Sequence, residues 1–132
     1  IDMVVRGICC LRAGVPDETE NIHIISIVGR YLEHSRIYIF GQGERARYYI
    51  GSADWMTRST LRRVEIAAPV TAPALKARLQ HIFDTMLADN CNARVQQPDG
   101  SYVRRMPGAD AVDCQAQFYE EAYQANVHSS LK

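Results

Sequence analysis

Two hydrophobic periods alternate along this chain, and the alternation restricts its possible folds more than any other feature of the sequence. Short runs rich in β-branched residues predict strands, and residues 22–28 (IHIISIV) are the clearest of them. Residues 71–87 instead space their apolar side chains by three and four, which predicts a helix with Pro73 in its first turn. Interleaved strands and helices favour the α/β class, with a mixed sheet and packed helices.

The other expected elements follow from the same two periods. A nearly continuous apolar run predicts a first strand over residues 3–11, buried on both faces, with Arg6 inside it. Residues 36–40 and 48–50 flank a glycine-rich turn and predict a hairpin. Further strands are expected over residues 61–70, 92–97 and 102–106, and a final helix is expected from its cap at Asp110 to about Asn126.

Composition limits the class of protein. The 132 residues include 15 basic and 15 acidic side chains, so we expect one globular domain over 1–132 that does not bind nucleic acid by bulk charge. No apolar run approaches the roughly 20 residues of a membrane span, and no secretory signal is visible. The four cysteines show no zinc spacing, so no metal site and a reducing, cytoplasmic location are expected. Because Ile1 already reads as part of a strand, a fragment of a longer protein is expected.

Arg6 breaks the pattern of the first expected strand. It shares a face with Val4 and Ile8, where a guanidinium is costly to bury without a carboxylate, a phosphate or the edge of a cleft beside it. A buried ion pair and a phosphate contact are both consistent with this position.

Two polar groups flank the expected hairpin. His34-Ser35-Arg36 precedes its first strand, and Gly51-Ser52-Ala53-Asp54 follows its second. If the hairpin closes, both groups lie at the same end of the sheet. A histidine for proton or phosphoryl transfer, an arginine for phosphate oxygens and backbone N–H groups beside small residues form a candidate phosphoryl site. A solvated loop is the alternative interpretation.

Local charge favours the phosphoryl site. Residues 29–63 hold seven arginines, no lysine and three acidic residues, although the whole chain is neutral. Arginine suits bidentate contacts with phosphate oxygens. A solvated basic face is the alternative.

These residues carry a resemblance to known proteins. His34-x-Arg36 followed by Gly51-Ser52-x-Asp54 resembles a diverged half of the phospholipase D signature, in which His-x-Lys precedes Gly-Ser-x-Asn. The longer strings VRGICCLRAGVP, SIVGRYLEHSRIYIFG, YYIGSADWM, RRVEI and DGSYVRR resemble the C-terminal catalytic domain of bacterial polyphosphate kinases, which is phospholipase D-like.

The resemblance implies a function. Such enzymes reversibly transfer the terminal phosphoryl group of ATP to polyphosphate through a phosphohistidine, and that histidine would lie in an upstream domain absent from this chain. The resemblance implies that Arg6, His34, Arg36 and Arg63 contact ATP phosphates and that His34 is the general acid for the leaving group. Ser35, Ser52 and Asp54 are secondary phosphate-site candidates, and Mg²⁺ would be bound outside these residues.

The resemblance is incomplete, which leaves other functions open. A full phospholipase D motif has Asp seven residues after its His, where this chain has Gly41. A phospholipase D-like phosphodiesterase or nuclease completed by homodimerisation, and a noncatalytic polyphosphate-docking module, are the alternatives. The chain alone is expected to lack kinase activity. The full-length enzyme is expected to be a homo-oligomer, cytoplasmic, with peripheral membrane association as an option.

Overall fold

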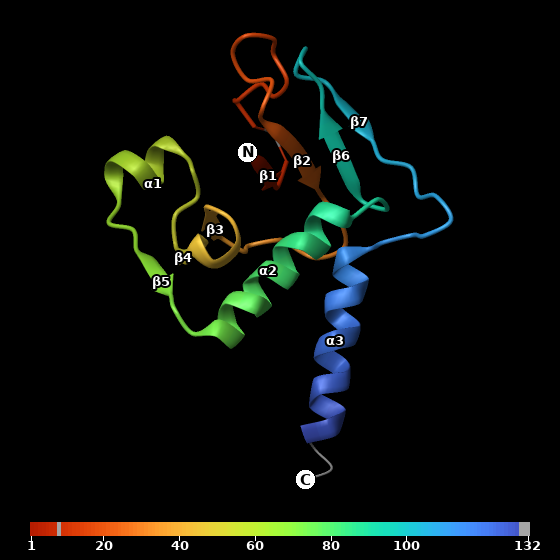
Figure 1. The fold of residues 1–132 in the computed structure, drawn as a ribbon. Helices are drawn as coiled ribbons and strands as arrows, with labels where there is room; N and C mark the ends of the chain where they lie inside the picture. The colour runs from red at the N-terminus through yellow and green to blue at the C-terminus, as the bar shows by residue number, and fades with distance from the viewer. Residues whose placement is uncertain (8, 130–132) are drawn as a thin grey trace. The chain divides into compact units, whose positions relative to one another are not determined.

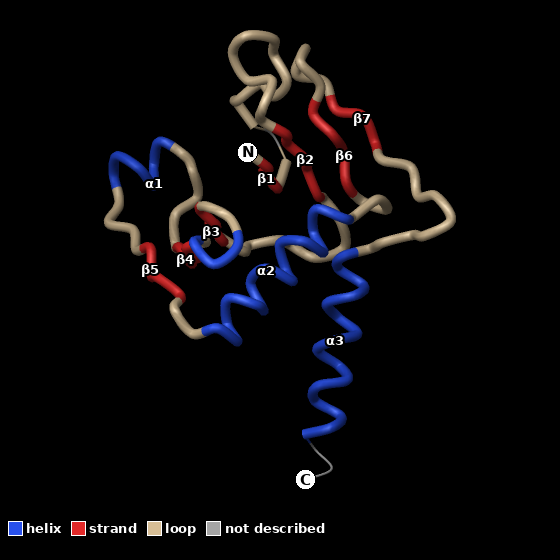
Figure 2. The backbone as a smooth tube through the Cα atoms, viewed as in Figure 1, coloured by secondary structure: helices blue, strands red, loops and turns tan. Residues whose placement is uncertain are grey.

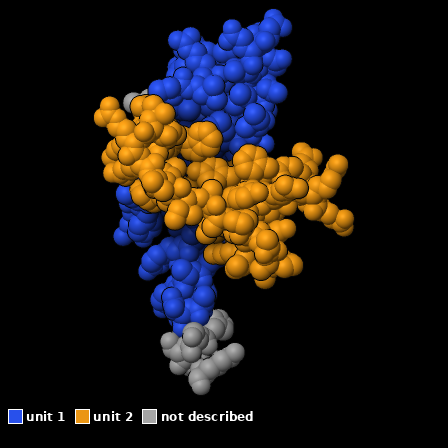
Figure 3. Space-filling view, turned by 90° about the vertical axis from the view of Figure 1, so that its left-hand side faces the viewer, with its two compact units in different colours: residues 1–33, 85–132 blue, residues 34–84 orange. Residues whose placement is uncertain are grey.

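The computed structural model describes residues 1–7 and 9–129, without the side chains of 128 and 129. The chain forms two compact units, coloured in Figure 3. Unit 1 comprises Ile1–Glu33 and the chain from Thr85 onward, and unit 2 comprises His34–Asp84. The expectation that both units belong to one domain stays a prediction.

Unit 1 is built around a four-stranded sheet with the order β1-β2-β6-β7. Strand β1 runs parallel to β2, whereas the β2–β6 and β6–β7 pairs are antiparallel (Figure 1). The central strand β2 carries the core, because Ile24, Ile25 and Ile27 are buried together with Ala93 and Cys114. The elements of unit 1 are β1 (Asp2–Val5), β2 (His23–Ile27), β6 (Ala93–Gln96), β7 (Tyr102–Arg104) and α3 (Cys114–Ser129).

Unit 2 is built around a three-stranded antiparallel sheet with the order β3-β4-β5. Figure 2 draws α2 as one continuous helix. It begins in this unit, and its residues from Thr85 onward belong to unit 1. The elements are β3 (Ile37–Phe40), the 3₁₀ turn η1 (Gly43–Arg45), β4 (Arg47–Gly51), α1 (Thr57–Arg62), β5 (Ala67–Val70) and α2 (Pro73–Ala88). The mixed α/β class is confirmed. Among the described residues, no helix has the length and apolarity to cross a membrane.

The first strand is shorter than its apolar run. Strand β1 ends at Val5, and Gly7 follows with φ +83°, a left-handed conformation that stops the extended backbone. Arg6 is therefore an exposed bend residue after the strand, and its expected place inside a buried strand is wrong. Ile8, expected to share a face with Arg6, lies outside the described residues.

Two further boundaries differ from the sequence prediction. The strand expected over 61–70 is wrong in its first half, because helix α1 extends to Arg62 and β5 starts only at Ala67. The final helix starts at Cys114 rather than after Asp110. Its cap is Asp113, whose Oδ1 accepts the backbone N–H of Ala116 at 3.0 Å.

Candidate functional site

The β3–β4 hairpin closes as its sequence predicts. Ile37 pairs with Ile50, and the backbone N–H of Gly51 donates to the carbonyl of Arg36 at 2.9 Å. Because an antiparallel pair aligns the start of one strand with the end of the other, the two polar groups lie at the same end of the sheet. This prediction is confirmed.

Arg36 and Asp54 meet at this end of the sheet. Arg36 Nη2 lies 2.9 Å from Asp54 Oδ1, and its Nε donates to the same oxygen at 3.1 Å. The two side chains are 17% and 33% exposed, so solvent only partly screens the pair. Arg36, expected as a phosphate ligand, is thus paired with the residue that ends the Gly-Ser-Ala-Asp turn, and its contact with phosphate stays a prediction.

The same guanidinium contacts His34. Arg36 Nη1 lies 3.1 Å from the ring Nδ1 and donates to the His34 carbonyl at 3.2 Å, while Nη2 lies 3.4 Å from Nε2. A guanidinium has donors only and a neutral imidazole has one acceptor nitrogen, so we assign acceptance to the nearer nitrogen, Nδ1, and the ring proton to Nε2. Asp54, Arg36 and His34 therefore form a linked chain that orients an exposed imidazole.

The remaining candidates of unit 2 lie in different surroundings. The Ser52 hydroxyl donates to Glu65 Oε2 at 2.5 Å and accepts the N–H of Ile66 at 3.0 Å, so it is already engaged. Ser35 and Arg63 are exposed, and within the described residues their side chains make no hydrogen bond or ion pair. Arg63 is the residue that follows helix α1.

Arg6 lies in unit 1, directly after β1. Its Nη1 donates to the carbonyl of Glu33 at 2.9 Å, which leaves most of its five N–H donors available. No carboxylate pairs with it in residues 1–7 and 9–129, so the buried ion pair is the wrong interpretation. That Arg6 and His34 act at one phosphate site stays a prediction.

Unit 2 also contains an aromatic hollow that the sequence analysis missed. Its volume is about 380 Å³, and its walls include the rings of Tyr38, Phe40, Tyr49 and Trp55. The Trp55 indole N–H donates to the Tyr38 hydroxyl at 3.1 Å. The alternation in β3 was the available signal, since Tyr38 and Phe40 share a face and Tyr49 lies opposite Tyr38.

Potential metal-binding side chains are dispersed among the described residues. Across the described ranges, no three His, Cys, Asp or Glu side chains gather as a metal ion would require. The Asp54 carboxylate is engaged by Arg36.

Comparisons with known proteins agree with this arrangement of elements. The chain is 56% identical over 109 residues to the polyphosphate kinase of Synechocystis, which covers 83% of the chain and 15% of that protein. It is 46% identical over 125 residues to the Bacillus anthracis polyphosphate kinase, covering 94% of the chain and 18% of that protein. The chain thus spans less than a fifth of these relatives.

A solved structure and a family model point the same way. The crystal structure of polyphosphate kinase from Porphyromonas gingivalis is similar to this chain, with a TM-score of 0.82 and 36% sequence identity. The match covers 94% of this chain and 19% of the chain in that crystal structure. The model of the polyphosphate kinase C-terminal domain 2 matches residues 1–117. The chain therefore belongs to the polyphosphate kinase C-terminal domain 2 family.

Proposed function

We propose that this chain is the C-terminal, phospholipase D-like part of an ATP:polyphosphate phosphotransferase. In the proposed reaction, the bond between the β,γ-bridging oxygen and the γ-phosphorus of ATP breaks, and ADP leaves. The phosphoryl group passes to a histidine of an upstream domain and then to the terminal oxygen of polyphosphate, and both steps are reversible. Mg²⁺ would be held by residues outside this chain.

The contact between Arg36 and His34 carries the proposal. A surface histidine in a solvated loop would have no fixed orientation, whereas His34 has its ring and its carbonyl beside one guanidinium. Asp54 holds that guanidinium from the other side. This support favours an oriented imidazole over the solvated-loop alternative.

We assign different tasks to the three arginines. Arg6 and Arg63 have no carboxylate partner among the described residues, so their charge is available for phosphate oxygens. Arg36 instead orients His34, because Asp54 offsets its charge. Phosphoryl transfer spreads negative charge over equatorial oxygens, so fixed cations lower its barrier by positioning and electrostatics.

The tautomer of His34 determines which ring nitrogen can act in the proposed phosphoryl transfer. With Nδ1 accepting from Arg36, Nε2–H is the donor of the ring; Nε2 lies 3.4 Å from Arg36 Nη2, which cannot accept, so we assign the hydrogen bond of Nε2–H to the phosphates. To act as a general acid it must become an imidazolium, and Nδ1 then carries a proton and can no longer accept from Arg36. Protonation of the departing ADP oxygen by Nε2 would leave the ring proton on Nδ1, so that proton must exchange to Nε2 before Nδ1 can again accept from Arg36.

The test is polyphosphate synthesis from radiolabelled ATP by the full-length enzyme that carries this chain. His34→Ala and Arg6→Ala are each expected to lower kcat about a hundredfold or more while the fold persists, since one oriented donor contributes about 3 kcal/mol. His23→Ala and Arg94→Ala are matched controls, because both side chains are exposed on the sheet of unit 1, and they should keep near-normal activity.

Three results would contradict the proposal. Near-normal turnover by His34→Ala or Arg6→Ala would remove their assigned roles. Cleavage of a chromogenic phosphodiester by the enzyme, lost in His34→Ala, would favour the phosphodiesterase alternative. Unchanged synthesis with weakened polyphosphate binding would leave this chain a docking role only.

A further inference from the structure

We propose that Gln115 is a positioning residue for His34. The inference rests on the function proposed above, in which the imidazole of His34 contacts ATP phosphates. Gln115 touches neither the histidine nor Arg36 through any hydrogen bond found in the structure. It acts on the backbone that enters the site.

The amide of Gln115 is bound on both sides to the segment before His34. Its Oε1 accepts the backbone N–H of Tyr31 at 2.9 Å, and its Nε2 donates to the Tyr31 carbonyl at 2.8 Å. The same Nε2 donates to Glu33 Oε1 at 2.9 Å. One side chain thus satisfies both backbone groups of Tyr31 and fixes the carboxylate of the residue bonded to His34.

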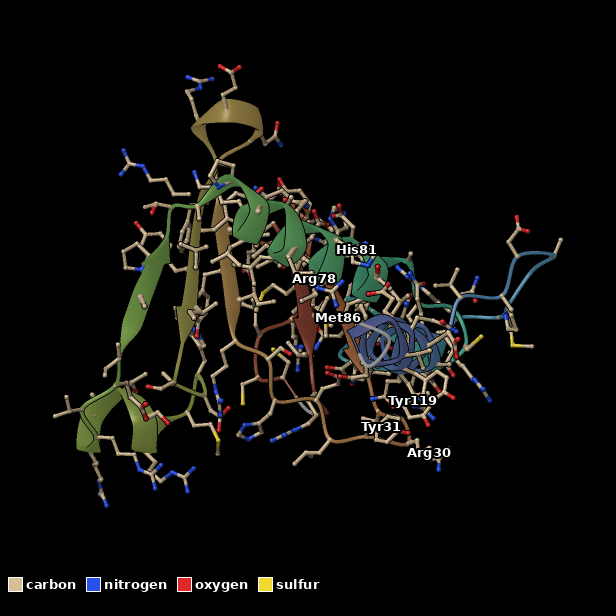
Figure 4. All side chains as sticks on the ribbon, turned by 90° about the horizontal axis from the view of Figure 1, so that it is seen from below. Arg30, Tyr31, Arg78, His81, Met86 and Tyr119 are labelled. Carbon is tan, nitrogen blue, oxygen red and sulfur yellow. The ribbon has the colours of Figure 1, made fainter. Side chains whose placement is uncertain are left out.

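The surroundings of Gln115 leave it little freedom. The residue is 5% exposed, and Figure 4 shows Tyr31 beside helix α3, as these hydrogen bonds require. A Cβ at Gly29 would lie 2.5 Å from its Oε1 and 3.0 Å from its Cδ. Gly29 is therefore the residue that lets the backbone pass this close to the amide.

Residue 33 is also held through its carbonyl. Arg6 donates to the Glu33 carbonyl at 2.9 Å, while Gln115 holds the Glu33 carboxylate. The peptide bond that starts at this carbonyl ends at the nitrogen of His34. Loss of Gln115 would free the Tyr31 backbone and the Glu33 side chain together. His34 would then follow a residue that is held less firmly.

The test compares two glutamines of the same helix in the full-length enzyme. Gln115→Met keeps the length of the side chain but removes its hydrogen bonds, and it is expected to lower kcat about tenfold to a hundredfold with little change in KM for ATP. Gln117→Met is the control, because Gln117 is exposed and its side-chain amide donates to Glu121 of the same helix, and it should match the parent enzyme. Activities are compared per folded molecule, measured by circular dichroism.

The same substitution in a His34→Ala enzyme distinguishes a positioning role of Gln115 from a general structural role. If Gln115 acts through His34, Gln115→Met should lower kcat no further in an enzyme that already carries His34→Ala. A structural role would instead add its loss to that of His34→Ala. Full activity of His34→Ala would refute the proposed function, whereas a loss in His34→Ala with none in Gln115→Met would refute only the positioning role.

Gly29→Ala provides a variant that leaves Gln115 in place. The added methyl group should displace the Gln115 amide and lower kcat as Gln115→Met does. Combined with Gln115→Ala, whose shorter side chain makes room, Gly29→Ala should cause no additional loss. An additive loss in the double variant, or a fully active Gly29→Ala enzyme, would overturn the inference even if Gln115→Met failed to fold.

Discussion

Two aspartates show how differently the two units use a carboxylate. Asp89 of unit 1 is fully buried, and its Oδ1 accepts the backbone N–H groups of Cys91, Asn92 and Ala93 at 3.1, 2.7 and 3.0 Å. Its Oδ2 accepts the N–H of Cys114 at 3.0 Å. The side chain of Asp54 in unit 2 is one-third exposed, and its Oδ1 pairs with the guanidinium of Arg36.

The partners explain the difference in role. Backbone N–H groups cannot move without moving their elements, so Asp89 joins the end of α2, the start of β6 and the start of α3. A guanidinium on a flexible stem can change partner, so the Asp54–Arg36 pair adjusts the position of a side chain. We infer that the first carboxylate supports architecture and the second supports the site.

The largest expected effect tests the architectural role. Asp89→Ala removes the acceptor of four backbone donors in a buried place, and we expect the free energy of unfolding to fall by about 3 to 5 kcal/mol. Urea unfolding measures this loss. Asp110→Ala is the control, because Asp110 is exposed, and a loss equal to that of Asp89→Ala would contradict the contrast.

The charge of Asp89 should also make the free energy of unfolding depend on pH in the acid range. Burial raises the pKa of Asp89, but the hydrogen bonds from Cys114, Asn92 and Ala93 outweigh it and hold the pKa below its ordinary value of 3.8. A lowered folded-state pKa stabilises the fold above the unfolded-state value, and this contribution is lost as pH falls through the folded-state pKa.

Asp89→Asn cannot ionise, so its unfolding free energy should depend less on pH in the acid range than that of the parent chain. Urea unfolding at a series of acid pH values measures the two slopes. Parallel slopes would show that the charge of Asp89 contributes nothing.

The smallest expected effect tests the role of Asp54, the second carboxylate of the comparison. Asp54→Ala frees Arg36 from its partner, and polyphosphate synthesis by the full-length enzyme is expected to fall about tenfold while the free energy of unfolding changes by less than about 1 kcal/mol. Ser101→Ala, on an exposed turn of unit 1, is the control for both assays. A large loss of stability in Asp54→Ala would make Asp54 a second structural carboxylate.

Local patterns predicted the hairpin and helix α2 because their signals lie within a few residues. The β3–β4 turn needs glycine at its tip, where Gly41 has φ +85°, and α2 has a regular apolar spacing with Pro73 at its first position. Helix α1 has no such spacing and no side-chain cap, so residues around Leu61 resembled a strand.

The pairings of the site could not be predicted from the sequence. Arg36 and Asp54 are 18 residues apart in the sequence, and Gln115 and Tyr31 are 84 residues apart. Contacts between residues so far apart do not produce a local sequence pattern. Sequence reasoning identified His34, Arg36 and Asp54 as candidates, but it did not predict the ion pair between Arg36 and Asp54. A side chain's partner depends on packing that only the folded chain supplies.

The separation of Gln115 from Tyr31 has a consequence during protein synthesis. A ribosome adds roughly 5 to 20 residues per second, so these 84 residues correspond to about 4 to 17 seconds of translation. Throughout that interval the backbone leading to His34 exists without the amide that later fixes it. The histidine turn can therefore reach its final setting only after the start of α3 has left the exit tunnel, although its own residues were translated early.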